Sequence, residues 1–375
     1  MAEPLKNQFG PDVAEQIADD LSAASRRAGS PFDRPAFLAQ CLDGFDDLEL
    51  GPRAQRIADA MADVLPNDRT AAMEIVLDSL GPELDGSDEF GMATFAYWPH
   101  VKFVADHGQG DVETALRLQY ELTKRFTAEF SIRAYLVGEH RDLTLGRLRE
   151  WTDDPNEHVR RLVSEGTRPR LPWAPRLREF VDDPSPALAL LERLRHDSSE
   201  YVRRSVANHL NDVAKDHPEI VIETCRRWWA AADHDGRRMI RHALRTLVKA
   251  GDLDALDVLG FGPSSPAVVE SSTITPDVAE IGGAVRIEMV IANPADEAAA
   301  ALVDVRVHFV KANGSTSPKV FRGSELELPP GETATVSKKV SVRQHSTRTH
   351  HPGTHRVEAL INGTIVELGS FELRP

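Results

Sequence analysis

Acidic and basic side chains recur at helical spacing in the middle of this 375-residue chain. Arg161, Glu165 and Arg168 lie three and four residues apart, which places them on one face of a helix, and Arg204 and Asp212 occupy the corresponding stripe further along. Arginines bind phosphate oxygens, and carboxylates stabilise positive charge that develops during a reaction. The pattern therefore indicates a face that could hold a phosphodiester backbone beside a cationic group. The alternative is an ordinary surface ion pair between Arg161 and Glu165, worth about 0.2–0.5 kcal/mol.

A tryptophan follows this helix directly. The segment Arg168-Pro-Arg-Leu-Pro-Trp173 is bracketed by prolines and presents an indole at its end. The face of an indole attracts cations, which suits a site that handles a positively charged group. The alternative is that Trp173 caps the core of a helical repeat.

The helices that carry these residues belong to an internal repeat of 43 residues, within the range of HEAT-like helix pairs. Stacking such pairs yields a solenoid with a concave surface. Local signals predict N-caps at Asp154 and Asp197, with Pro155 at the first helical position and Glu157 at the third. The residues repeated at this displacement are Asp154, Glu157, Val159, Arg160, Arg161 and Val163, which recur as Asp197, Glu200, Val202, Arg203, Arg204 and Val206.

The periodicity of apolar residues changes near residue 260. Helical spacing runs from Asp12 to about Gly260, and strict alternation follows a turn-rich linker. About seven short strands fit an immunoglobulin-like sandwich. The sequence predicts a multidomain protein, an all-α HEAT-like repeat solenoid over residues 1–262 followed by an all-β immunoglobulin-like sandwich over residues 263–375. The clearest alternations are Val285, Ile287, Met289 and Ile291; Val303, Val305, Val307 and Phe309; and Val357, Ala359 and Ile361.

Composition limits the class of protein and its partners. The formal net charge is −15, yet residues 156–250 carry 18 Lys and Arg against 14 Asp and Glu, so a polyanion is attracted to the middle of the chain alone. No apolar run approaches the roughly 18 residues of a membrane helix, and the first residues lack a secretory signal, which predicts a cytoplasmic protein. Cys41 and Cys225 are too few for a disulfide framework or a thiolate metal site.

Four segments resemble the AlkC branch of the AlkC/AlkD DNA alkylation repair glycosylases. The resemblance covers roughly residues 10–260, and the C-terminal sandwich is similar to the Ig-like extension of one subgroup of that branch. It implies a solenoid that hydrolyses the N-glycosidic bond of alkylated bases such as 3-methyladenine and 3-methylcytosine. The segments that carry the resemblance are Trp98–Val104, Tyr120–Arg133, Asp154–Trp173 and Ser205–Asp212.

Carried over position by position, the resemblance implies that Glu129, Glu165 and Asp212 are catalytic and that Trp173 binds substrate. Arg161, Arg168 and Arg204 are expected to contact DNA. The implied substrate is double-stranded DNA with alkylated bases, bound by a monomer without a membrane, a metal or an organic cofactor. The resemblance also implies that the damaged base is not rotated out of the duplex.

A loop in the sandwich, Arg343-Gln-His-Ser-Thr-Arg-Thr-His-His-Pro-Gly-Thr-His-Arg356, collects arginines, histidines and hydroxyls. We expect Arg343 and Arg348 to contact DNA phosphates. A plain polar hairpin tip is the alternative, and the histidine spacing matches no common metal site.

Two other functions fit the same sequence. A HEAT scaffold could bind another protein through the groove without catalysis. A DNA-damage-binding protein could keep the fold without the reaction.

Overall fold

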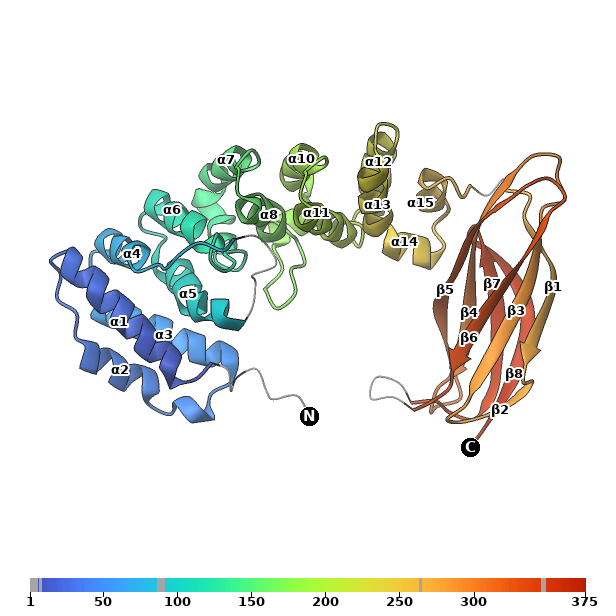
Figure 1. Cartoon of the computed structure of the whole chain (residues 1–375), viewed down its shortest axis with the longest axis horizontal. Coiled ribbons are helices and arrows are strands. Elements are labelled where there is room, and N and C mark those ends of the chain that lie inside the picture. Colours follow the sequence, from blue (N-terminus) through green and yellow to red (C-terminus); the bar gives the residue numbers. More distant parts are fainter. Residues whose placement is uncertain (1–5, 7–8, 86–91, 263–264, 345–348) are drawn as a thin grey trace. The chain divides into compact units, whose positions relative to one another are not determined.

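The computed structural model consists of a helical region followed in the sequence by β-strands (Figure 1). It describes residues 6, 9–85, 92–262, 265–344 and 349–375. The chain forms two compact units, Met1–Asp216 and His217–Pro375, so that the last helices belong to the same unit as the sheets. This confirms the predicted fold class, whereas the domain boundary at 262/263 stays a prediction.

The helices of the first unit occupy most of its length. Within the described residues, no helix is both long and apolar enough to cross a membrane. The first unit contains α1 (Pro11–Arg27), α2 (Arg34–Leu42), α3 (Leu50–Val64), α4 (Arg69–Asp78), α5 (Trp98–His107), α6 (Val112–Thr123), α7 (Arg141–Trp151), α8 (Glu157–Gly166), α9 (Arg178–Asp182), α10 (Ser185–Leu194) and α11 (Glu200–Val213), and the second begins with α12 (Pro218–Trp229), α13 (His234–Ala243), α14 (Arg245–Ala250) and α15 (Leu253–Val258).

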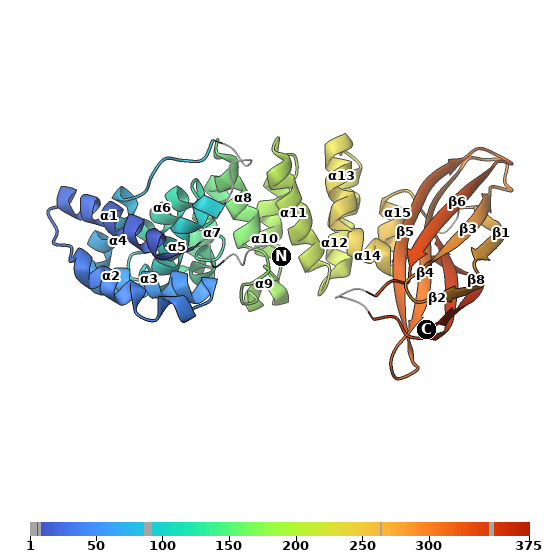
Figure 2. The same cartoon turned by 60° about the horizontal axis from the view of Figure 1, so that its bottom comes forward.

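The 43-residue repeat extends to individual hydrogen bonds. Arg160 Nη1 donates to the carbonyl of Asp154 at 2.8 Å, and Arg203 Nη1 donates to the carbonyl of Asp197 at 2.6 Å. Arg160 Nε also lies 2.6 Å from Asp197 Oδ2, which ties one repeat to the next. Helices α8 and α11 consequently lie side by side (Figure 2).

The predicted helix starts in these repeats are wrong by two residues. Asn156 and Ser199 are the N-caps, and α8 and α11 begin at Glu157 and Glu200. Asp154 Oδ1 instead accepts a hydrogen bond from Asn156 N, and Asp197 Oδ1 accepts one from Ser199 N. Each aspartate therefore forms an Asx turn ahead of the helix, an alternative use of the same side chain.

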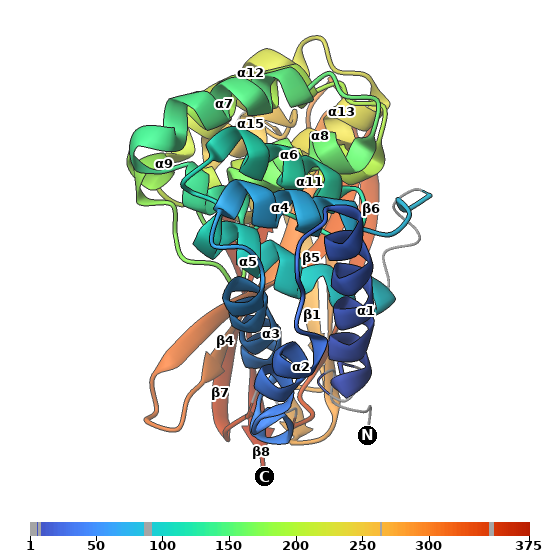
Figure 3. The ribbon, with the colours of Figure 1, turned by 90° about the vertical axis from the view of Figure 1, so that its left-hand side faces the viewer.

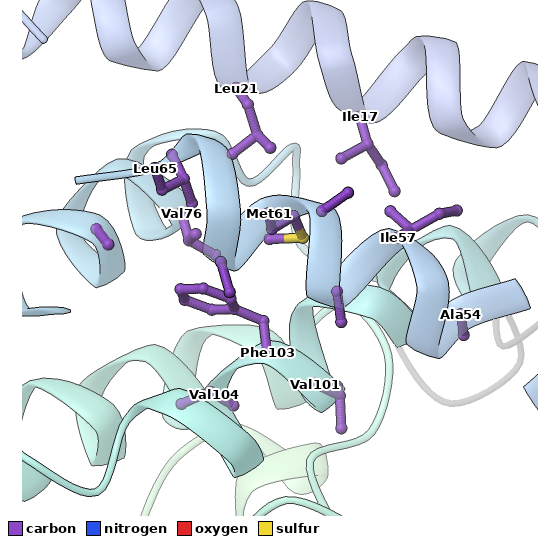
Figure 4. Packing of buried hydrophobic residues seen from close by; sticks show 14 of the residues in the cluster. Ile17, Leu21, Ala54, Ile57, Met61, Leu65, Val76, Val101, Phe103 and Val104 are labelled. Atoms are coloured by element: carbon purple, nitrogen blue, oxygen red, sulfur yellow. The ribbon is translucent and has the colours of Figure 1, made fainter. Parts of the chain in front are cut away.

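The first helices pack around a hydrophobic core that Figure 4 shows from close by. Ile17 of α1, Ile57 and Met61 of α3, and Phe103 of α5 are each at most 2% exposed. Apolar residues spaced three and four apart on each helix supply this face.

The C-terminal strands form two sheets, as expected of an immunoglobulin-like sandwich. A three-stranded sheet has the order β1-β3-β6, and a five-stranded sheet has the order β2-β8-β7-β4-β5. Strands β4 and β7 run antiparallel and adjacent (Figure 3), and β2 pairs with β8 in parallel. The side chains of the three predicted alternations are buried between the sheets. The strands are β1 (Val268–Thr275), β2 (Val278–Glu280), β3 (Ala284–Ala292), β4 (Ala299–Val310), β5 (Thr316–Leu328), β6 (Thr333–Ser341), β7 (Gly353–Ile361) and β8 (Thr364–Arg374).

The hydrophobic core of the first helices allows us to predict how much stability is lost when a buried side chain is removed. Phe103→Ala should lower the free energy of unfolding by about 3–5 kcal/mol, because the fully buried ring leaves a space that its neighbours refill only in part. Urea unfolding followed by circular dichroism measures the change. The control is Leu143→Ala, at a side chain that is 44% exposed on α7, which should shift stability by about 0.5 kcal/mol or less. Equal losses in the two variants would contradict the assignment of this core.

Candidate active site

Three carboxylates from separate segments meet in one network joined by two guanidinium groups. Arg161 Nη1 lies 2.5 Å from Glu129 Oε2, and its Nη2 lies 3.6 Å from Glu165 Oε1. Arg168 Nη1 donates to Glu165 Oε1 at 2.5 Å, and its Nε donates to Asp212 Oδ2 at 2.8 Å. We call Glu129, Arg161, Glu165, Arg168 and Asp212 the carboxylate–arginine network.

The members of the network come from two helices, from the residues just after one of them, and from a turn. Arg161 and Glu165 lie one turn apart on α8, and Arg168 follows just after that helix ends at Gly166. Asp212 is on α11, the corresponding helix of the next repeat. Glu129 lies in a turn after α6, where Thr127 Oγ1 donates to its Oε2 at 2.7 Å.

Polar side chains outside the network fix the position of Glu165. Ser205 Oγ donates to Glu165 Oε2 at 2.5 Å and lies 2.9 Å from Ser164 Oγ. His209 Nδ1 lies 2.9 Å from the carbonyl of Ser164. Because a carbonyl only accepts hydrogen bonds, Nδ1 carries the proton. Burial lowers the pKa of His209 to about 4, so the ring is neutral at pH 7.

Burial and charge act in opposite directions on the network. Glu129, Glu165, Arg168 and Asp212 are 3–8% exposed. Burial alone would raise the pKa of Glu165, but Arg161, Arg168 and the hydrogen bond from Ser205 hold it below its ordinary value. Burial likewise works to lower the pKa of Arg168, and Glu165 and Asp212 raise it instead. Both groups are therefore charged at neutral pH.

The carboxylates of the network are balanced by buried cations. Three carboxylates face the two guanidinium groups of the network, and the buried Arg133 lies near enough to Glu129 and Asp212 to interact with them electrostatically. Lys215, 44% exposed at its side chain, lies with Nζ 2.8 Å from Asp212 Oδ1. A positive charge that develops near these carboxylates is stabilised most where water is scarce. The arrangement can thus stabilise a transient cation.

The tryptophan predicted to bind substrate is presented to solvent. Trp173 is 90% exposed and has a φ of +65°, in the left-handed region that side chains seldom adopt. This excludes the alternative in which the indole caps a repeat core. Arg133 fixes the loop, because its Nη1 donates to the carbonyl of Arg168 and its Nη2 to that of Pro175, each at 2.6 Å. The loop therefore begins at a member of the carboxylate–arginine network.

Trp173 also lines a groove of about 1090 Å³ within the first unit. Trp98 and Lys102 of α5 form another part of its wall, and Arg56 of α3 and Arg176 of the loop contribute further cations. Two carboxylates, Asp59 and Asp106, also line it. Aromatic rings and cations along one groove suit a ligand that combines flat rings with negative charge.

The remaining predicted DNA contacts lie outside the network. Arg204 is exposed on α11 and pairs with Glu200 across one turn at 3.2 Å, so the structure does not bring it to Glu165. Arg343 is exposed, and its Nε donates to the carbonyl of Gly282 at 3.2 Å. Arg348 lies outside the described residues. Two histidines of the same segment, His350 and His355, are buried beside Phe309 and Phe371 and belong to the sandwich core.

Sequence reasoning missed the side chains that hold the network in place. Ser205 lies seven residues before Asp212, two turns along the same face of α11, and this spacing could have indicated it. Tyr201 lies one turn earlier, with its ring centre 5.1 Å from Arg161 Cζ. Lys215 lies three residues after Asp212, a spacing that could also have indicated it, whereas Thr127 gave no such signal. Across the described ranges, no group of three or more His, Cys, Asp or Glu side chains is arranged as a metal site.

Comparisons with known proteins agree with this architecture. Residues 126–247 match the family described as DNA alkylation repair enzyme, and residues 268–375 match the C-terminal Ig-like domain of the protein YhaZ. The chain is 31% identical to "Uncharacterized protein YhaZ" of Bacillus subtilis (strain 168) over 360 residues, covering 96% of this chain and 97% of that one. The chain belongs to the DNA alkylation repair enzyme family. A solved structure described as Pseudomonas fluorescens alkylpurine DNA glycosylase AlkC bound to DNA containing an abasic site analog matches all of both chains, with 32% identity and a TM-score of 0.85.

Removing the buried Arg168 side chain should reduce stability far more than removing an exposed arginine such as Arg204. Arg168→Ala leaves the buried carboxylates of Glu165 and Asp212 without their shared partner, so the free energy of unfolding should fall by about 3–5 kcal/mol. Arg204→Ala, at the exposed pair, should change it by about 0.5 kcal/mol or less. Urea unfolding of both variants measures the difference, and similar values would contradict the proposed coupling.

The lowered pKa of Glu165 predicts a pH dependence of stability. Because the folded carboxyl titrates below its unfolded value of 4.5, its contribution is present above pH 4.5 and is lost as the pH falls through the folded pKa. Glu165→Gln removes this contribution, so the free energy of unfolding should fall less steeply than in the parent as the pH is lowered below 4.5. Glu150→Gln, at an exposed residue of α7, should retain the parental slope. An unaltered slope in Glu165→Gln would show that Glu165 titrates as in the unfolded chain.

Proposed function

We propose that this protein is a DNA glycosylase that excises cationic alkylated bases, of the 3-methyladenine and 3-methylcytosine class, from duplex DNA. The observation that carries the proposal is the gathering of Glu129, Glu165 and Asp212 in one buried network at the base of the Trp173 loop. The proposal is also supported by the structural match of the whole chain to an alkylpurine DNA glycosylase.

In the proposed reaction the bond between C1′ of the deoxyribose and the base nitrogen breaks first. The electron pair leaves with the base, whose positive charge is thereby neutralised, so strong acid catalysis is unnecessary. Positive charge moves to the sugar as an oxocarbenium ion, and Glu165 and Asp212 stabilise it electrostatically. A water oxygen then bonds to C1′ and its proton passes to the solvent, which leaves an abasic site.

The burial of the carboxylates fits electrostatic stabilisation better than covalent attack. Both Glu165 oxygens are already hydrogen-bonded, one to Arg168 and the other to Ser205. Neither oxygen is free to become a nucleophile without breaking a buried bond. Glu129 supports the network by holding Arg161 in place.

Trp173 is assigned to the lesion side of the site, where its exposed indole packs against the sugar or the cationic base. The damaged base is proposed to stay in the duplex rather than to rotate into a pocket, as the family resemblance implies. We also propose that Arg161, Arg168, Arg204 and Arg343 contact the DNA. The protein is proposed to act as a monomer and without a metal or organic cofactor.

The test measures release of methylated bases from duplex DNA treated with a methylating agent. The parental protein should release 3-methyladenine or 3-methylcytosine, detected by chromatography and mass spectrometry. Glu165→Gln and Asp212→Asn should each slow release by about 10²–10³-fold, because each removes charge that stabilises the transition state. Their affinity for duplex DNA should stay close to that of the parent.

Glu150→Gln serves as the matched control, since it removes an exposed carboxylate of α7 that pairs with Arg147. It should excise at the parental rate. Lesion-selective binding without release would favour a damage-binding protein, and neither binding nor release would favour a protein scaffold. A joint loss of affinity and release in Glu165→Gln would assign that residue to binding or folding.

A further inference from the structure

Cationic side chains recur every four residues along α13 and α14. Arg237, Arg241, Arg245 and Lys249 follow this spacing, which places successive members on the same side of a helix. The two helices are separated by Leu244 alone, whose φ of −81° and ψ of −2° stay in the right-handed region. Between residues 234 and 250, five Lys and Arg stand against one acidic residue, in a chain whose net charge is −15.

This concentration of charge disfavours the helix itself. Like charges four residues apart destabilise a helix by about 0.2–0.5 kcal/mol per pair. Carboxylates offset part of the repulsion, since Arg241 lies 2.8 Å from Glu325 of β5 and Arg238 lies 4.0 Å from Asp235. In the part of the chain that the structure describes, Arg237 and Lys249 make no ion pair. Positive charge therefore remains at the surface, where a ligand can use it.

An aromatic ring holds two of these guanidinium groups. The Cζ atoms of Arg237 and Arg241 lie 5.2 and 5.6 Å from the ring centre of Trp229, within the range of a cation–π contact. With Arg238, His234 and one carboxylate they line a hollow of about 650 Å³ on this unit. That carboxylate, Asp233, accepts a hydrogen bond from Gly236 N at the start of α13. Guanidinium groups held in place lose little freedom on binding, and their planar donors match phosphate oxygens.

We propose that the surface formed by Arg237, Arg238, Arg241, Arg245 and Lys249 binds the phosphodiester backbone of duplex DNA. This inference rests on the proposed function and deepens it, because the network arginines are shared with carboxylates and supply only part of the positive charge that the phosphates of a duplex require. Arg168 is 8% exposed and bonded to Glu165 and Asp212, whereas Arg238 is 54% exposed at its side chain. The backbone is the partner because its regular negative charge complements a row of cations and requires no base sequence.

The test is the salt dependence of binding to an undamaged duplex, with the full chain and fluorescence anisotropy. Each phosphate contact contributes about 0.9 to the slope of log affinity against log salt, so Arg237→Gln/Arg238→Gln should bind more weakly, with a slope shallower by about two. Lys249→Gln, at an exposed side chain, should lower the slope by about one. This single variant keeps the test valid if the double variant fails to fold.

The matched control is Arg226→Gln/Arg227→Gln, which removes the same charge from the adjacent helix α12, where Arg226 is paired with Glu223 and Asp257. The control should keep the parental slope. Unchanged slopes in the α13 and α14 variants would overturn the proposal and leave an acidic protein as the partner of this surface. Equal losses in the control would overturn it as a general effect of net charge.

The result is independent of catalysis, because undamaged DNA offers no base to excise. If the parental protein releases no base yet binds DNA through these arginines, the proposed function fails and this inference stands. If it releases bases while the slopes stay unchanged, this inference alone fails.

Discussion

Arg168 is a single buried cation that several parts of the first unit share. Its guanidinium binds Glu165 of α8 and Asp212 of α11, and its carbonyl accepts a hydrogen bond from Arg133. A charge with so little access to water is stable only while its partners stay in place. The register of two successive repeats, the start of the Trp173 loop and the position of two carboxylates therefore depend on one another.

The periodic features of this architecture could be predicted from the sequence, because periodicity follows from backbone geometry. Apolar spacing identified the helices, and strict alternation identified β3, β4 and β7. The N-caps were misplaced because an aspartate can accept a hydrogen bond in a turn as readily as at a helix start. The predicted 43-residue spacing between the repeats is still correct, because both repeats contain the same Asx turn and both helix starts were misplaced by the same amount.

The site was predictable where its residues share a helix or lie on the corresponding helix of the next repeat. Arg161 and Glu165 followed from their spacing on α8, whereas Glu129 lies in a turn and was found through family resemblance alone. Repetition predicted the position of a residue and not its partners: Arg204 occupies the position of Arg161 one repeat later, yet it lies at the surface, outside the network. Arg161 contacts Glu129 and Tyr201, which come from other segments of the chain. A sequence repeat therefore predicts where a residue lies on its helix, but not which residues surround it.

The loop after α8 places an indole in water on a backbone of unfavourable conformation. The left-handed φ of Trp173 costs about 1–3 kcal/mol, and leaving a large aromatic ring unburied forgoes about 2 kcal/mol. A chain shaped by folding alone would hold glycine there. A ligand that covers the indole buries its apolar surface and gains the roughly 2 kcal/mol that folding leaves unused. Part of the affinity for such a ligand is therefore already present in the exposed ring of the free protein. Binding of a ligand to Trp173 should therefore raise the melting temperature of the first unit without rearranging its core.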